Sequence, residues 1–249
     1  MRAILTYHSI DPSGSPISVS PEDFRRHVQW LASGRVRVLP LADLVDEQGG
    51  EDAVALTFDD GFANFGEIAS PLLRAYALPA TVFIVSDHVG GNNEWEGVAA
   101  PGIPTLPLLE WKSLGRLAEQ GIELGAHTRR HRALPTLSAD QIDDEVGGGI
   151  AVVRRELGSA PRSFAYPYGA VDERSAGVVR RNVSLACTTV LRELRTGDDR
   201  AQLPRLDMFY LRRAGRLESW GTPAFTRHLW VRAQARRVRQ AVVSARAGK

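Results

Sequence analysis

Two pairs of side chains in this sequence could bind one metal ion between them. Residues 57–61 read TFDDG and place two adjacent carboxylates after an apolar run, and His127 and His131 stand four residues apart further along the chain. Two imidazoles at this spacing can reach one ion from a helical turn or a tight loop. One carboxylate and two imidazoles leave open positions and suit zinc or another divalent transition metal. The second carboxylate could then serve as a general base beside an activated water.

Each part of this set also has a simpler interpretation. Asp-Asp-Gly is ordinary turn chemistry, and a lone histidine is more often a hydrogen-bonded structural residue. Adjacent side chains on an extended strand point to opposite sides, so Asp59 and Asp60 can serve one site only if the chain turns there. Gly61 favours such a turn. The zinc-protease helix motif is not matched, because Thr128 stands where that motif has its glutamate.

A third cluster, residues 164–169, reads FAYPYG. Tyr168 lies between a proline and a glycine, so we expect a turn to fix its backbone N–H. A fixed N–H near a metal is what an oxyanion site requires, and the rings could form an apolar wall for a sugar or an acetyl methyl group. Core packing is the alternative interpretation of these aromatic residues.

Short apolar runs alternate with helix-like stretches along most of the chain, which predicts parallel strands joined by right-handed crossovers. No dinucleotide-binding fingerprint accompanies them, so we expect a barrel with its active site at the carboxyl ends of the strands. Polar residues do follow the apolar runs at these ends. The predicted strands are residues 3–7, 36–39, 53–58, 80–85, 122–126, 164–166, 185–190 and 206–210. The predicted helices begin at Ser20-Pro21 and Ser70-Pro71 or cover residues 41–47, 108–119 and 138–157, the last interrupted by Gly147–Gly149.

Composition limits the classes of protein to consider. At 249 residues and 43% hydrophobic content, the chain can form one large domain. A net charge of +2 does not favour nucleic acid as a partner. Cys187 is the only cysteine, so no internal disulfide is expected, and its apolar neighbours predict a core position. The first residues lack the pattern of a signal peptide, so a cytoplasmic location is the default expectation.

The C-terminal region, residues 223–249, is predicted to be a basic helix or tail outside a domain formed by residues 1–222. No acidic residue follows Glu218, and apolar residues recur at helical spacing among the basic ones. Such a helix could make peripheral contact with an anionic membrane. Packing against the barrel or a solvated tail is the alternative interpretation. Basic and aromatic residues are not interleaved, which argues against nucleic-acid binding.

Four motifs together resemble the polysaccharide deacetylase family, whose shared region is called the NodB homology domain and which is carbohydrate esterase family 4. They are LTFDDG at 56–61, PATVF at 79–83, GAHTRRH at 125–131 and AYPYG at 165–169. LTYH at 5–8 and LPR at 203–205 resemble the exopolysaccharide-deacetylase branch. The resemblance runs from about Met1 to Tyr210, and it implies a single-domain, distorted (β/α)7–8 TIM-like barrel.

The resemblance also implies a chemistry. It assigns Asp59 as general base, Asp60, His127 and His131 as ligands of a divalent metal, and the Tyr168 backbone N–H as an oxyanion donor. The metal is expected to be zinc, with cobalt, nickel or iron as alternatives. The substrate would be an N-acetylglucosamine-type sugar in a polysaccharide, an oligosaccharide, or a lipid-linked or small conjugate. A catalytically inert carbohydrate-binding protein on the same barrel is the alternative function.

Two departures from the family pattern leave roles to fill. Many members have an arginine where this chain has Ala165, and a late Leu-x-His motif that supplies the general acid is not matched around His228. His8 is the candidate acid, because the first strand should deliver it to the barrel mouth; a supporting or substrate-binding role is the alternative. Arg205 could replace the missing arginine by orienting Asp59; its alternative is a surface salt bridge.

Overall fold

The computed structural model describes residues 1–47 and 49–247, with side chains described up to residue 238. A curled sheet of parallel strands forms its centre, in the order β10-β1-β5-β6-β7-β8-β9, and β4 pairs with the start of β5. The strands are β1 (Arg2–Tyr7), β4 (Arg37–Val38), β5 (Ala53–Phe58), β6 (Thr81–Ile84), β7 (Glu123–Ala126), β8 (Ser163–Ala165), β9 (Leu185–Cys187) and β10 (Leu206–Asp207). Two short strands, β2 (Ser9–Ile10) and β3 (Ser18–Val19), pair separately.

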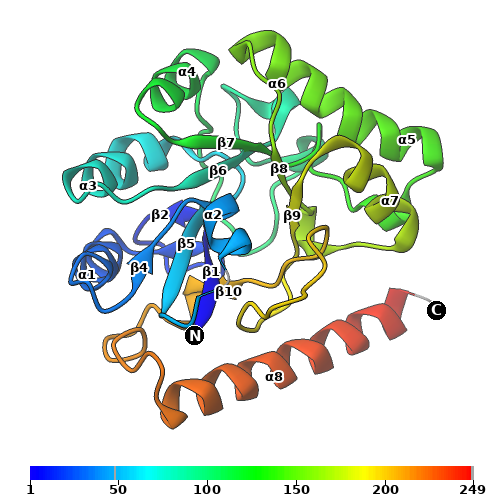
Figure 1. Cartoon of the computed structure of the whole chain (residues 1–249). Helices are drawn as coiled ribbons and strands as arrows, with labels where there is room; N and C mark the ends of the chain where they lie inside the picture. Colours follow the sequence, from blue (N-terminus) through cyan, green and yellow to red (C-terminus); the bar gives the residue numbers. More distant parts are fainter. Residues whose placement is uncertain (48, 248–249) are drawn as a thin grey trace.

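The two edges of this sheet come together through one segment of chain. The backbone N–H of Leu203 donates to the carbonyl of Ala186 in β9, and Leu206 pairs with Leu5 of β1. Figure 1 shows the strands at the centre with helices arranged around them. The predicted distorted (β/α) barrel is therefore confirmed.

Side chains alternate between the two faces of the strands. One face of β1 and β5 packs outwards in a cluster with α1 (Pro21–Leu31), α3 (Ser70–Ala75) and α4 (Trp111–Glu119). The other face packs inside the barrel in a cluster that contains Ile4, Ala55, Phe83 and Cys187. The buried position of Cys187 confirms that it is a core residue. On β1, β5 and β7, every second side chain faces the inside of the barrel. The same alternation, continued past the end of each strand, places His8, Asp59 and His127 on the inner side.

The helices cover the outside of the barrel and follow the predicted alternation. They are α1 (Pro21–Leu31), α2 (Leu41–Asp46), α3 (Ser70–Ala75), α4 (Trp111–Glu119), α5 (Ala139–Asp143), α6 (Gly149–Leu157), α7 (Glu173–Asn182) and α8 (Pro223–Ala247). α1 begins as predicted, with the Ser20 hydroxyl accepting the N–H of Asp23. α2 differs from the others in that Leu41 and Leu44 pack in the inner cluster.

Some predicted boundaries are wrong. The helix expected to begin at Ser70-Pro71 is preceded by a π-helical turn over Phe65–Ala69, where Pro71 has no amide hydrogen to donate to the preceding turn. The strand expected over 206–210 ends at Asp207 and continues as a 3-10 turn over Met208–Tyr210. The helix expected over 138–157 has its predicted ends, with Ser138 as cap and Leu157 as last residue, but a π-helical turn over Asp144–Gly148 divides it into α5 and α6. α7, capped by Asp172, was not predicted.

α8 begins at the predicted boundary and anchors its first turns on the barrel. Phe225 and Leu229 are buried in the outer cluster. The division into residues 1–222 and 223–249 stays a prediction. Val242 and Ala245 are among the apolar residues that recur at helical spacing in this region, and their side chains lie outside the described part. Among the helices within residues 1–47 and 49–247, none has the length and apolarity needed to span a bilayer.

Candidate active site

Asp60, His127 and His131 converge at the carboxyl ends of β5 and β7. Each offers one ligand atom, and these three atoms lie within 4.8 Å of one another. Both imidazole Nε2 atoms are 3.3 Å from Asp60 Oδ1, and all three residues are buried. The chain turns at Asp60 and Gly61, whose φ angles are 71° and 75°. The turn that the sequence required for both carboxylates to serve one site is therefore present.

The chemistry of these groups suits a bound cation. Asp60 Oδ1 is buried without a hydrogen-bond partner among the described residues. His127 Nδ1 is 2.7 Å from the carbonyl of Ala165, which only accepts, so Nδ1 carries the hydrogen. The Nε2 atom then faces the Asp60 carboxylate, so it needs either a proton or a cation between the two groups. Burial opposes a charged imidazole, but the carboxylates of Asp60 and Asp59 outweigh it and raise the pKa of His127.

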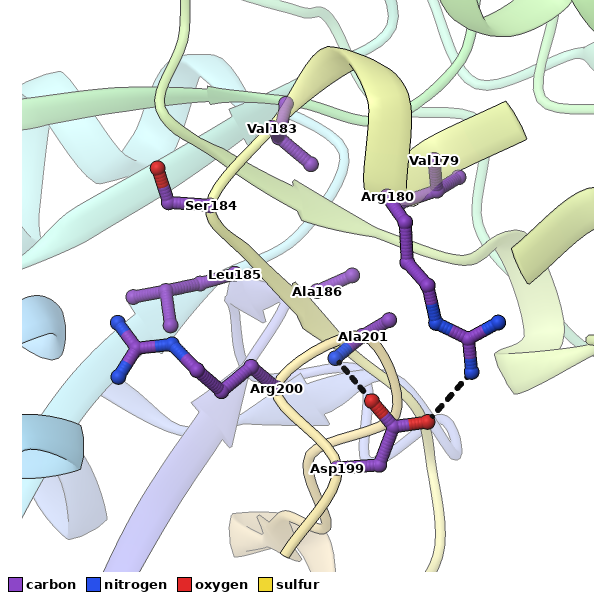
Figure 2. Close-up of a pocket in the computed structure, with 9 residues that line it drawn as sticks. All are labelled: Val179, Arg180, Val183, Ser184, Leu185, Ala186, Asp199, Arg200 and Ala201. Atoms are coloured by element: carbon purple, nitrogen blue, oxygen red, sulfur yellow. Dashed lines mark hydrogen bonds and ion pairs between the residues drawn. The ribbon is translucent and has the colours of Figure 1, made fainter. Parts of the chain in front are cut away.

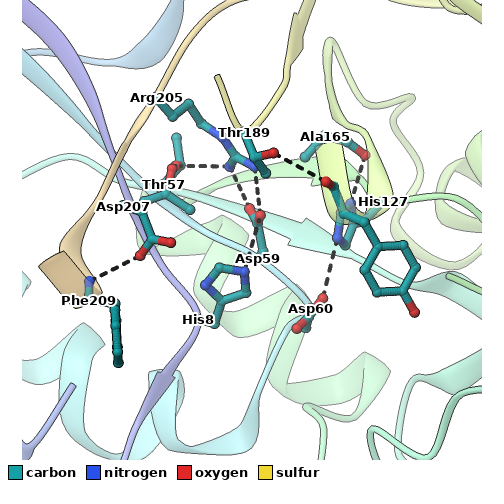
Figure 3. Close-up of polar contacts among 12 residues, drawn as sticks. His8, Thr57, Asp59, Asp60, His127, Ala165, Thr189, Arg205, Asp207 and Phe209 are labelled. Carbon is teal, nitrogen blue, oxygen red and sulfur yellow. Dashed lines mark hydrogen bonds and ion pairs between the residues drawn. The ribbon is translucent and has the colours of Figure 1, made fainter. Parts of the chain in front are cut away.

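Asp59 is held on its other side by Arg205. The guanidinium donates from Nη1 to Oδ1 over 2.6 Å and from Nη2 to Oδ2 over 2.7 Å, and both residues are buried (Figure 3). Burial favours the neutral carboxyl, but the Arg205 charge outweighs it and lowers the pKa of Asp59. Arg205 also donates from Nε to the carbonyl of Thr188. The surface-salt-bridge interpretation of Arg205 is therefore wrong, because the pair is inside the barrel mouth.

His8 extends from the end of β1 towards the same carboxylate. Its Nε2 atom is 3.7 Å from Asp59 Oδ2, and its side chain is partly open to solvent. Figure 3 shows His8 beside Asp59, with Asp60 and His127 next to them. The structure brings His8 to the predicted barrel mouth; its role as general acid stays a prediction.

Tyr168 lies at the edge of the site in a strained turn. Its φ angle is 60°, and its backbone carbonyl accepts from the Thr189 hydroxyl. A Cβ on the next residue, Gly169, would come within 2.0 Å of that hydroxyl oxygen, so this turn requires glycine. The phenol oxygen is 3.2 Å from His131 Nδ1, although the residue is 59% exposed. The side-chain contact was not predicted, and the oxyanion role of the backbone N–H stays a prediction.

Trp95 also contacts the site from the long loop between β6 and α4. Its ring stacks on His131 with 4.3 Å between centroids and an interplanar angle of 30°. The Tyr168 ring contacts the same imidazole edge-on, with 4.7 Å between centroids and an interplanar angle of 68°. Residues 92–107 of this loop are rich in glycine and proline, and long loops of this kind are often functional. Only the fold shows that Trp95 is the side chain that meets His131.

A separate cavity lies elsewhere on the barrel. Its volume is about 290 Å³, and it lies at the amino end of β9. Figure 2 shows its lining residues, among which Arg180 and Asp199 form an ion pair. None of the predicted site residues lines it. Because active sites of such barrels lie at the carboxyl ends of the strands, the convergent side chains mark the site and this cavity does not.

Comparisons with known proteins identify relatives of this chain. Residues 46–183, more than half of the chain, match the family model described as polysaccharide deacetylase. A poly-beta-1,6-N-acetyl-D-glucosamine N-deacetylase of Staphylococcus epidermidis is 25% identical over 203 residues, covering 76% of this chain and 67% of that protein. YxkH of Bacillus subtilis is 26% identical over 177 residues, covering 69% of this chain but only 58% of that protein. The chain thus spans about three fifths of the length of such relatives.

Solved structures share the fold. IcaB from Ammonifex degensii superimposes with a TM-score of 0.70 at 24% identity, covering 82% of this chain and 90% of that one. The Streptococcus pyogenes deacetylase PplD gives a TM-score of 0.70 at 22% identity, covering 82% and 91%. The region matched by the family model contains Asp59, Asp60, His127, His131 and Tyr168, whereas His8 and Arg205 lie outside it. By sequence and by fold, the chain belongs to the polysaccharide deacetylase family.

Proposed function

We propose that this chain is a metal-dependent hydrolase that removes the acetyl group from N-acetylglucosamine-type sugars. The observation that carries the proposal is the meeting of two groups at one barrel mouth. Asp60, His127 and His131 form a buried ligand set, and Asp59 stands beside it with its carboxylate fixed by Arg205. The relatives named as poly-beta-1,6-N-acetyl-D-glucosamine deacetylases support the sugar class.

The proposed mechanism divides the work among these residues. Asp60, His127 and His131 would hold a divalent metal, which supplies a Lewis acid for the acetyl carbonyl and lowers the pKa of water. Asp59 accepts the proton of the attacking water, while Arg205 keeps the carboxylate oriented and ionised. The Tyr168 N–H donates to the carbonyl oxygen as it gains negative charge. The carbon–nitrogen bond then breaks, His8 protonates the departing amine, and acetate and the free amine leave.

The donor set favours zinc among the divalent metals. Two imidazoles and one carboxylate with open positions are typical of catalytic zinc sites. Cobalt, nickel and iron accept the same ligands, and the order of affinities among these metals does not follow from geometry alone. Zinc is therefore the metal to test first, and the other three are the comparisons.

Acetate release from a panel of N-acetylated sugars tests the proposal. The panel should hold free, polymeric and lipid-linked N-acetylglucosamine, each tested as purified, after chelation, and after zinc is restored. We expect release that chelation abolishes and zinc restores, and an Asp60→Asn control that binds little metal. Binding of the sugars without acetate release under any of these conditions would instead favour the inert carbohydrate-binding alternative. Release that chelation leaves unchanged would overturn the metal dependence.

A further inference from the structure

The loop that carries the two histidines has a backbone that needs support. Thr128 and His131 both have left-handed conformations, with φ angles of 62° and 61°. Such conformations cost free energy in residues other than glycine and persist where surrounding contacts hold them. The Thr128 hydroxyl accepts the N–H of His131 over 3.0 Å, which is one of these contacts. The residues between the histidines are held by a different group.

That group is Glu145, a fully buried carboxylate on the helix behind the loop. Its Oε2 atom accepts the backbone N–H of Arg129 over 3.1 Å and that of Arg130 over 2.8 Å. Its Oε1 atom accepts from Arg130 Nε over 2.8 Å. The carboxylate therefore fixes two consecutive peptide groups midway between His127 and His131. Nothing in the proposed mechanism uses Glu145.

The helix is shaped to bring this carboxylate to the loop. Residues Asp144–Gly148 form a π-helical turn, a feature found frequently at functional sites. A Cβ on Gly149 would lie 3.1 Å from the carbonyl carbon of Thr128 and 3.2 Å from the nitrogen of Arg129. Glycine at 149 thus lets the helix touch the loop backbone, which accounts for part of the glycine run that interrupts the helical pattern.

We propose that Glu145 is a positioning residue that holds His127 and His131 in the geometry needed to bind a metal ion. This inference rests on the proposed function, because it assumes that the three convergent residues bind metal. Partners that orient metal ligands without touching the metal typically contribute 10- to 100-fold to affinity. Glu145 does not contact the ligand side chains but holds the backbone of the loop that carries them. Because its effect would be on metal affinity, the metal dissociation constant is the quantity to measure.

The first test compares Glu145→Gln with Asp144→Asn. Glutamine keeps the size of the side chain and one acceptor, but loses the charge and turns an amide group towards Arg130. Asp144 lies on the same π-helical turn but is partly exposed and pairs only with arginine side chains. We expect Glu145→Gln to raise the dissociation constant for Co²⁺, followed by visible absorption, by about 10-fold or more. Asp144→Asn should stay within about threefold of the parent.

The second test removes the close approach without changing any charge. Gly149→Ala adds a methyl group against the Thr128 backbone, whereas Gly147→Ala places one 3.8 Å from its nearest neighbour, an oxygen of Asn182. We expect Gly149→Ala to weaken Co²⁺ binding and Gly147→Ala to leave it unchanged. If Glu145→Gln does not fold, the comparison of Gly149→Ala with Gly147→Ala tests whether the helix supports the metal-binding loop.

The outcomes separate the two proposals. A parent protein that binds no Co²⁺ at the site overturns the proposed function and this inference with it. A parent that binds Co²⁺, together with a folded Glu145→Gln variant of equal affinity and an unchanged absorption spectrum, overturns the inference alone. If Glu145→Gln is unfolded, a Gly149→Ala variant that binds Co²⁺ with the affinity of the parent protein would also overturn the inference.

Discussion

Two adjacent aspartates have different surroundings because the chain turns between them, directly after β5. Asp59 continues the inward-facing row of β5 and meets Arg205. Asp60 has a left-handed backbone and meets the two imidazoles instead. Burial opposes ionisation of both, yet nearby cationic groups hold the pKa of each carboxyl below its ordinary value, that of Asp60 well below. Residues of one type can therefore take the roles of base and ligand through backbone conformation and partners alone.

Replacing Asp59 by Asn separates these two roles. Asn keeps the shape of the side chain but cannot accept a proton, so we expect turnover to fall by about 10²-fold or more. Zinc content should stay at the parental level, because Asp60, His127 and His131 are intact. Steady-state kinetics and metal analysis on the same preparation measure both. Near-parental turnover would remove Asp59 from the mechanism.

Arg205 is predicted to act through Asp59, and a double-mutant cycle tests this. Arg205→Met leaves the Asp59 charge buried without its partner, which typically costs about 3–5 kcal/mol of stability. The same change in an Asp59→Asn background should cost clearly less, because the charge is already gone. Urea unfolding of the four proteins gives the coupling energy. Equal costs in both backgrounds would mean that Arg205 stabilises the fold by other contacts.

The sequence identifies site residues that are marked by type and spacing. Asp59, Asp60, His127 and His131 stand out because rare combinations of ligands follow apolar runs. The pairing of Arg205 with Asp59 could only be suggested, since it joins residues far apart in the chain that meet at the closure of the barrel. Glu145 could not be recognised, because it is one of several acidic residues on its helix and only the fold shows that it is the buried one that meets the loop.

The local sequence predicts whether a segment is a helix or a strand better than it predicts where that helix or strand ends. The apolar run 53–58 became β5 without change, and the Ser20-Pro21 signal began α1. β9 ends at Cys187, three residues earlier than predicted, because the chain leaves the sheet there while residues up to 190 still bond to the segment that closes the barrel. The residues that pair where the barrel closes are set by the arrangement of the whole sheet. A short window of sequence does not contain that information.

α1 is joined to β1 by a buried histidine that should make the fold sensitive to acid. The Tyr7 hydroxyl donates to His27 Nδ1 over 3.2 Å, and Nε2 faces the carbonyl of Leu211 at 3.3 Å. A carbonyl only accepts, so these contacts suit the neutral imidazole. Burial is the main cause that lowers the pKa of His27 to about 4, and the charge of Arg26 adds to it.

The sign of the effect follows from proton binding. Between pH 6.5, the ordinary pKa of histidine, and pH 4, the unfolded chain binds a proton at His27 that the folded protein does not. Stability therefore falls as the pH falls through this window, by about 2–3 kcal/mol at pH 4.5 relative to pH 7.5. His27→Gln keeps one donor and one acceptor and should lose this part of the pH dependence. His228→Gln replaces a less buried histidine in α8 and is the control. It should change the pH dependence of the free energy of unfolding less than His27→Gln does.

At the scale of the molecule, α8 extends the barrel with a face that no described element covers. Figure 1 shows it lying along one side of the strands and helices. Its buried side, with Phe225 and Leu229, packs on the outer cluster. Trp230, Val231 and Val238 are 62%, 50% and 65% exposed, and at helical spacing they share one face. Exposed arginines accompany them, and no acidic residue follows Glu218.

We propose that this face of α8 contacts anionic membranes, since a tryptophan with flanking arginines suits the interface of a bilayer.

The full chain should bind vesicles containing anionic phospholipid and should not bind vesicles of neutral phospholipid. Arg227→Gln and Arg237→Gln should each weaken binding about fivefold, because an arginine near such a surface contributes about 1 kcal/mol. Trp230→Ser should weaken it through lost apolar contact, whereas Val98→Ser, at a 68% exposed residue of the long loop, should not. Co-sedimentation measures all of these. Binding that ignores lipid charge, or that survives Trp230→Ser and both arginine changes, would leave α8 as a helix that only packs on the barrel.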